Sequence, residues 1–212
     1  MTLDLYYTPS TCSLAAHIAL EEAGIDYTAH FVKLYDSDAQ NAYRAIIPAG
    51  KVPALRIDGT ILMENIGIMG LAALLRPEAR LLPADPIEAA HCLSLLSWFA
   101  STMQLNRRQS RAPVRFTADA TTYPSLSAAG RDRFAANLRE LDERLEGRTW
   151  LIGDQFTVAD GYALVFWDWA LADGFDAEAF PNFADHARRV MERPAVRRVL
   201  EQERHPLLRR QA

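Results

Sequence analysis

The strongest chemical candidate in this 212-residue sequence is Cys12, which follows the loop Thr8-Pro9-Ser10-Thr11 in the first turn of a predicted helix. Unpaired N–H groups and the dipole of a helix N-terminus favour an anion. A thiol placed there can be tuned toward the thiolate, and the neighbouring Ser13 hydroxyl can donate to a second sulfur. We therefore predict Cys12 and Ser13 as catalytic residues. The alternative for Cys12 is a small buried apolar residue, the role we predict for Cys92 inside a later helix.

A second candidate is the segment Lys51-Val52-Pro53-Ala54, in which a proline opens a predicted strand just after Gly50. This pattern fits the rare cis X–Pro bond. A cis bond there would turn the N–H and C=O of Val52 outward, where they could pair with an extended peptide. An ordinary trans proline at a sheet edge is the alternative, and the pattern is compatible with both isomers.

A third candidate is the pair Glu64-Asn65, at the start of the helix that follows a predicted hairpin turn at Asp58-Gly59. Groups at a helix N-terminus can hold a carboxylate, and a glutamate can pair with an amino group. The pair therefore suits a γ-glutamyl or an amino-acid end of a ligand, because either presents both a carboxylate and an amino group. The alternative is structural, with Asn65 as a helix cap and Glu64 placed favourably near the helix dipole.

A fourth motif, Thr157-Val158-Ala159-Asp160, predicts structure rather than chemistry. The Thr157 side chain can cap the Asp160 N–H while the Asp160 carboxylate reaches back to the Thr157 N–H. We predict no catalytic role for either residue. We also expect His91 and His186 to be solvated or capping residues, because no histidine shows triad-like spacing to a serine and a carboxylate.

The elements that must position these residues change character along the chain. The first third predicts strands at 3–7, 27–34, 52–57 and 61–63 with helices at 12–23 and 64–75, leaving a short undefined segment before the third strand. The first strand, helix and second strand form a right-handed crossover unit. Three prolines within 77–86 then mark a boundary. We predict an α/β domain at 1–78, a linker at 79–86 and an all-α helical bundle at 87–212.

The helical part is predicted from its apolar periodicity and its prolines. We expect helices over residues 87–108, after Pro124, over 157–172, and over 181–193 and 194–203, the last two opened by proline. The 157–172 stretch is apolar nearly all round, which predicts burial between other helices.

Composition excludes several classes of function. A net charge of −4, from 23 Lys+Arg and 27 Asp+Glu, argues against a nucleic-acid partner. No uncharged run reaches the ~18 residues that a membrane span needs. The two cysteines have no metal ligands at the right spacing, and the first residues show no export signal, so we expect no metal, reduced thiols and a cytoplasmic location.

Taken together, four segments resemble cytosolic glutathione transferases, above all the bacterial beta class: residues 6–14, 52–55, 64–65 and 156–160. The resemblance covers nearly the whole chain. It implies an N-terminal thioredoxin-like domain, a C-terminal helical domain, a homodimer, and glutathione as co-substrate. In that pattern Cys12 is the active-site residue. The glutathione-binding residues predicted here are Tyr7, Lys51, Val52, Pro53, Glu64 and Asn65.

The sequence departs from the beta-class pattern at identifiable positions. Ser10 stands where that class often has glycine, and Gln104 and Leu105 stand where it often carries a His-Lys pair near the active site. We predict Gln104, Arg107 and Arg108 as substrate-binding residues in its place. Zeta-class isomerases resemble the Cys12 motif too, but usually have an arginine soon after it, which this sequence lacks.

The resemblance implies that the protein activates glutathione as a thiolate and transfers it to a small hydrophobic electrophile, with thiol transfer through Cys12 as a second outcome. Two alternatives remain open. One is a non-catalytic module that binds glutathione or another ligand, because fold does not determine activity. The other is a specialised glutathione-dependent isomerase, dehalogenase or ether-cleaving enzyme.

Overall fold

The computed structural model describes residues 1–210, and its first third forms one mixed four-stranded sheet in the order β2-β1-β3-β4. The strands are β1 (Leu3–Tyr7), β2 (Thr28–Phe31), β3 (Ala54–Ile57) and β4 (Thr60–Met63). β1 runs parallel to β2 and antiparallel to β3, which pairs antiparallel with β4. Asp58 and Gly59, with φ of 45° and 94°, form the predicted two-residue turn.

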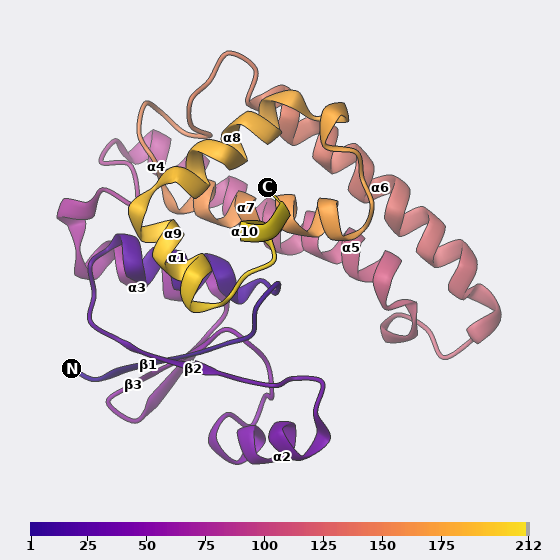
Figure 1. Cartoon of the computed structure of the whole chain (residues 1–212), viewed down its shortest axis with the longest axis horizontal. Coiled ribbons are helices and arrows are strands. Elements are labelled where there is room, and N and C mark those ends of the chain that lie inside the picture. The colour runs from indigo at the N-terminus through magenta and orange to yellow at the C-terminus, as the bar shows by residue number, and fades with distance from the viewer. Residues whose placement is uncertain (211–212) are drawn as a thin grey trace.

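Three helices accompany the sheet: α1 (Ser13–Glu22), α2 (Ser37–Ile46) and α3 (Asn65–Leu75). α1 and α3 cover the face that meets the helical domain, and α2 lies on the opposite side (Figure 1). The prediction of an undefined segment before β3 is wrong, because α2 forms there, capped by Asp36, whose carboxylate accepts from Ala39 N–H at 2.9 Å. Ala39, Ala42, Tyr43 and Ile46 have the spacing of one helical face, a signal that the sequence analysis did not use, although only Tyr43 is buried.

The remaining chain is helical. Its helices are α4 (Pro86–Trp98), α5 (Gln104–Arg111), α6 (Tyr123–Arg144), α7 (Val158–Ala172), α8 (Pro181–Glu192), α9 (Pro194–Gln202) and α10 (Leu207–Arg210). The single helix predicted over 87–108 is divided by a π-helical turn at Phe99–Met103, which joins α4 to α5. α10 was not predicted, since four residues are too few to show a helical period.

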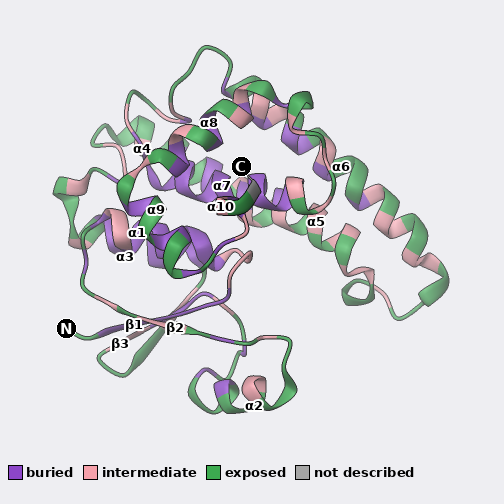
Figure 2. Ribbon diagram, in the orientation of Figure 1, coloured by how far each residue is buried: buried purple, intermediate pink, exposed green. Residues whose placement is uncertain are grey.

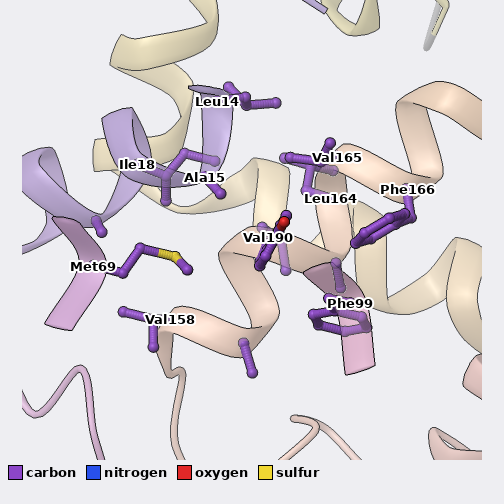
Figure 3. Packing of buried hydrophobic residues seen from close by; sticks show 14 of the residues in the cluster. Leu14, Ala15, Ile18, Met69, Phe99, Val158, Leu164, Val165, Phe166 and Val190 are labelled. Atoms are coloured by element: carbon purple, nitrogen blue, oxygen red, sulfur yellow. The ribbon is translucent and has the colours of Figure 1, made fainter. Parts of the chain in front are cut away.

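The sheet domain and the helical domain share one hydrophobic core. α1 packs against α3 on one side and against α7 and α9 on the other. Figure 3 shows Ile18 of α1, Met69 of α3 and Val165 of α7 within this core. α7 is buried along almost its whole length, as its apolar sequence predicts (Figure 2).

Two buried histidine–carboxylate pairs strengthen this packing. His17 Nδ1 on α1 lies 2.7 Å from the Glu203 carboxylate just beyond α9, and both side chains are fully buried. His186 Nε2 on α8 lies 2.8 Å from the Asp160 carboxylate, again with both side chains fully buried. The prediction that His186 is a solvated or capping residue is therefore wrong. The α8 face that carries it packs against α7, a contact that the α8 sequence does not specify.

The predicted capping box at the start of α7 is confirmed. The Asp160 carboxylate accepts from the Thr157 N–H at 2.7 Å, and the Thr157 hydroxyl accepts from the Ala159 N–H at 3.3 Å. The same carboxylate also accepts from the Leu151 N–H at 2.9 Å, which ties the preceding loop to the helix. Asp160 thus satisfies backbone donors of both the helix and the loop in a site without water access.

Candidate functional site

Cys12 lies at the N-terminal boundary of α1, at the end of a loop that the helical domain holds in place. The indole Nε1 of Trp169 on α7 donates to the Ser10 carbonyl at 3.0 Å. Ser10 has a φ of 56°, a left-handed conformation that favours glycine and is adopted here by serine. This explains why glycine suits the position in the family pattern. The α7 contact thereby positions the residues that lead into Cys12.

Ser13 is fully buried and its hydroxyl is engaged within the same loop. The Ser13 Oγ accepts from the Thr8 N–H and donates to the Thr8 carbonyl, both at 3.1 Å, and lies 2.8 Å from the Thr11 hydroxyl. These contacts hold the loop closed at the end of β1. A direct contact from Ser13 to a second sulfur stays a prediction, and it would require breaking one of these bonds.

The Cys12 thiol points across the site to the segment before β3. Its Sγ donates to the Val52 carbonyl at 3.6 Å, and the Val52–Pro53 peptide bond is cis. The Tyr43 hydroxyl on α2 donates to the Lys51 carbonyl at 2.8 Å and so fixes the approach to this bond, while the Lys51 side chain is exposed. The sequence pattern allowed both isomers, and the structure has the cis form that exposes the Val52 backbone.

Burial raises the pKa of the Cys12 thiol, and this desolvation outweighs the groups that favour the thiolate. The positive charge of Arg108 and a hydrogen bond from the Asn65 side chain act in the opposite direction and lower the pKa. The sequence predicted that a thiol at a helix start can be tuned toward the thiolate, but here desolvation has the larger effect on the Cys12 pKa.

The raised pKa leads to a testable pH dependence for Cys12. We expect its alkylation by iodoacetamide in the ligand-free protein to rise with pH and to level off only above pH 9.0, the ordinary thiol value. Burial also raises the pKa of Cys92 to about 11, so Cys92 should react far more slowly. Mass spectrometry of peptides alkylated between pH 6 and 10 measures both rates. A plateau for Cys12 below pH 8 would contradict this view of the site.

Tyr162, which the sequence analysis did not select, joins the predicted Gln104 in the wall of the site on the helical domain. The hydroxyl of Tyr162 on α7 donates to the Gln104 Oε1 on α5 at 3.0 Å. Burial raises the pKa of Tyr162. The nearby Cys12 sulfur raises this pKa further, and a hydrogen bond with the Asn65 side chain lowers it, so Tyr162 lies next to both residues. The available signal was a tyrosine in an otherwise apolar helix, since a buried Tyr hydroxyl usually has a polar partner.

Glu64 and Asn65 occupy the start of α3, next to Cys12. Asn65 is buried, and its Oδ1 has no hydrogen-bond partner within the described chain. Glu64 is exposed and has a φ of 70°, a strained conformation for a non-glycine residue of the kind that gathers at functional sites. Neither side chain caps α3, so the alternative of a simple helix cap is wrong. The Asn65 Oδ1 acceptor without a partner and the carboxylate of Glu64, held on a strained backbone, are suited to binding a polar ligand.

The two adjacent tyrosines of β1 lie on opposite faces of the sheet, as strand geometry predicts. The Tyr6 ring stacks on His30 with a centroid distance of 4.9 Å and contacts Tyr43 of α2. The Tyr7 ring packs on His17 of α1 at 4.9 Å. Tyr7 therefore lies on the α1 side and beside the buried His17 pair, and its predicted contact with glutathione stays a prediction.

The three arginines of α5 differ in their partners. The Arg107 guanidinium bonds the Asp173 carboxylate at 2.8 and 3.0 Å and lies 4.3 Å above the Trp169 ring. The Arg111 Nε is 3.5 Å from the same carboxylate. Arg108 is exposed and forms no ion pair within residues 1–210. Of the predicted substrate-binding residues, Arg107 is thus already engaged, whereas Gln104 and Arg108 border the site.

No cluster of three or more His, Cys, Asp or Glu side chains in residues 1–210 has the geometry of a metal site. Nor does this part of the chain contain a helix of the length and apolarity that a bilayer requires.

The sheet is thioredoxin-like, a cysteine lies at the start of α1, a cis-proline precedes β3, and a helical domain packs against α1. Together these features define the architecture of a glutathione transferase. Residues 9–70 match the model "Glutathione S-transferase, N-terminal domain" and residues 117–194 match "Glutathione S-transferase, C-terminal domain". Glutathione S-transferase GstA of Escherichia coli O157:H7 is 33% identical over 95% of this chain and 98% of its own.

Solved structures agree with this assignment. A Sulfitobacter glutathione transferase homologue with bound glutathione superposes with a TM-score of 0.88 at 31% identity, covering 95% of this chain and 98% of its own. The beta-class enzyme of Sphingomonas chungbukensis gives 0.82 at 32% identity, covering 94% and 98%. The chain belongs to the glutathione S-transferase family and is most similar to its bacterial beta class, which confirms the resemblance and the two-part fold.

Proposed function

We propose that this protein binds glutathione in the cleft beside Cys12 and transfers the glutathione sulfur to a small electrophile held against the helical domain. The observation that carries the proposal is the arrangement of the Cys12 thiol, 3.6 Å from the Val52 carbonyl and next to the cis Val52–Pro53 bond. This places a sulfur-binding group beside an exposed length of backbone. An extended thiol-containing peptide matches that pair of features.

The polar groups around Cys12 support glutathione as that peptide. The Val52 N–H has no hydrogen-bond partner within the described chain and can pair with the cysteinyl backbone. Glu64 can bind the γ-glutamyl ammonium, and the unpaired Asn65 Oδ1 can accept from the same end of the ligand. Lys51, exposed beside Val52, can reach the other carboxylate. The ammonium and one carboxylate of glutathione thus have complementary side chains, and the backbone N–H groups at the start of α3 can hold the γ-glutamyl carboxylate.

Activation of glutathione requires stabilisation of its thiolate, which is the nucleophile. Lowering a thiol pKa from ~9 to ~6.5 corresponds to about 3.4 kcal/mol. Two hydrogen bonds to a charged sulfur, at ~1.5–3 kcal/mol each, can supply this energy. Cys12, at the start of α1, and the hydrogen-bond donors beside it can form these two hydrogen bonds to the glutathione sulfur. The thiolate then forms a C–S bond at the electrophilic carbon as the leaving group departs.

The same proposal includes a cytoplasmic homodimer acting on small hydrophobic electrophiles, as in detoxification. Support for the dimer comes from large apolar side chains left exposed on neighbouring elements. Leu74 at the end of α3 is 78% exposed and Ile87 at the start of α4 is 68% exposed. Such side chains are suited to an interface between two copies. Size-exclusion chromatography with light scattering measures the oligomeric state.

Calorimetric titration of the full chain with glutathione tests the binding step. We expect saturable binding that Glu64→Gln weakens about tenfold, because the substitution removes a charge-assisted hydrogen bond to the ammonium. Glu78→Gln is the matched control, since Glu78 is exposed in a turn beyond α3, and it should bind like the wild type. Absence of binding at millimolar glutathione would overturn the proposal. Binding without turnover of any electrophile or disulfide would instead support the non-catalytic module.

Thiol transfer through Cys12 is the second candidate activity. It is favoured by a free thiol that is only partly buried, in contrast to the fully buried Cys92. A disulfide substrate could react with Cys12 to form a mixed disulfide with glutathione, which a second glutathione would resolve. A specialised isomerase, dehalogenase or ether-cleaving enzyme would show turnover on its own substrate alone.

A further inference from the structure

The positive charge of Arg108 on α5 has no ion-pair partner within residues 1–210. Arg107 and Arg111 share the carboxylate of Asp173, whose side chain is only 5% exposed and which accepts no hydrogen bond from the third arginine. Arg108 stands between them in the sequence but projects from a different face of α5, because successive helical residues are rotated by about 100°. Its guanidinium is exposed and forms neither an ion pair nor a hydrogen bond within residues 1–210.

The position of Arg108 directs this charge to the reaction centre. Arg108 lies four residues after Gln104 and so on the same face of α5, one turn further along. Gln104 accepts from the Tyr162 hydroxyl at 3.0 Å. The Arg108 charge also acts on both the Cys12 sulfur and Tyr162. Arg108 therefore borders the cleft from the helical domain, on the side left for the second substrate.

Resting on the proposed function, we propose that Arg108 binds a carboxylate on the electrophile, so that the second substrate is a small carboxylated electrophile. A guanidinium binds a carboxylate with two parallel hydrogen bonds, which orients as well as attracts it. The charged groups of glutathione have other complementary residues, Glu64 and Asn65 at one end and Lys51 at the other. This refines the expectation of a purely hydrophobic electrophile.

The experiment uses the glutathione conjugate of a probe with a removable charge. In 4-chloro-3-nitrobenzoate, the glutathione thiolate bonds to the ring carbon and chloride leaves with its electron pair, giving S-(4-carboxy-2-nitrophenyl)glutathione. Calorimetry compares the affinity of the full chain for this conjugate and for its benzoate methyl ester, so the measurement needs no turnover. We expect the wild type to bind the acid about tenfold more tightly than the ester.

Variants of α5 assign the preference to one side chain. Arg108→Gln should abolish the preference for the acid while leaving the affinity for the ester within about twofold, and Arg108→Lys should restore part of it. Arg111→Gln is the matched control, because it removes an arginine one turn away that lies 3.5 Å from Asp173, and it should keep the tenfold preference. The ratio of kcat/KM for the benzoate and its ester should follow the same order.

The outcomes separate this inference from the function on which it rests. Equal affinity of the wild type for acid and ester, or a preference that survives in Arg108→Gln, would overturn the carboxylate site alone. Failure of both conjugates to bind would overturn the glutathione site as well. A preference of the wild type that weakens with added salt, together with its absence in Arg108→Gln at any salt concentration, would support the inference.

Discussion

Replacement of Cys12 by serine is expected to abolish thiol transfer while glutathione binding stays within about threefold of the wild type. In the proposed reaction the Cys12 thiolate attacks the glutathione sulfur of a disulfide between glutathione and a second thiol, forms an S–S bond to glutathione, and the second thiol leaves as a thiolate that takes up a proton. A second glutathione then attacks the mixed disulfide and frees Cys12. A serine hydroxyl cannot form either disulfide, so we expect a loss of ~1,000-fold or more in kcat/KM with a model disulfide.

The matched control for this prediction is Cys92→Ala. Cys92 is fully buried in α4, with its Sγ 4.0 Å from the Thr157 hydroxyl, and should contribute nothing to thiol transfer. Conjugation to an electrophile is expected to survive in Cys12→Ser, because a hydroxyl can still donate to the glutathione sulfur. Unchanged thiol transfer in Cys12→Ser would exclude Cys12 from the chemistry. An equal loss of glutathione binding would make it a structural residue.

Asp160→Ala is expected to cause the largest loss of stability, about 3–5 kcal/mol. The substitution would leave the buried N–H groups of Thr157 and Leu151 without an acceptor and would remove the partner of the buried His186 ring. These three groups come from a helix start, a loop and α8, so the change acts on the whole core of the helical domain. Urea denaturation followed by circular dichroism measures the free energy of unfolding.

Asp85→Ala is the control for Asp160→Ala, because it also removes the cap of a helix. The Asp85 carboxylate accepts from the Ile87 and Glu88 N–H groups at 2.9 Å, but at an exposed helix start. Water can replace it there, so we expect a cost of about 1 kcal/mol. Similar losses in the two variants would show that the buried contacts of Asp160 add nothing to its role as a cap.

The local features of the site could be predicted because neighbouring residues determine them. Three features each depend on a few consecutive residues: the strand, loop and helix start around Cys12, the tight turn at Asp58-Gly59, and the capping box at Asp160. The failures had the same origin. α2 is short and buries only one side chain, so its helical spacing was overlooked, and the π-helical turn at Phe99–Met103 leaves the helical pattern uninterrupted.

Contacts between distant residues were decided only by the tertiary structure. Arg107 and Arg108 are chemically identical neighbours in the sequence, and only the approach of Asp173 pairs one and leaves the other free. Tyr162 reaches the site because α7 packs against α1, which no local pattern of α7 encodes. The sequence by itself determined the family, the two-part fold and the cysteine at a helix start. Packing determined the burial that raises the Cys12 pKa, and it also determined that the charge of Arg108 acts on the Cys12 sulfur. Both depend on groups far apart along the chain, because desolvation and charge pairing arise only when distant segments pack together.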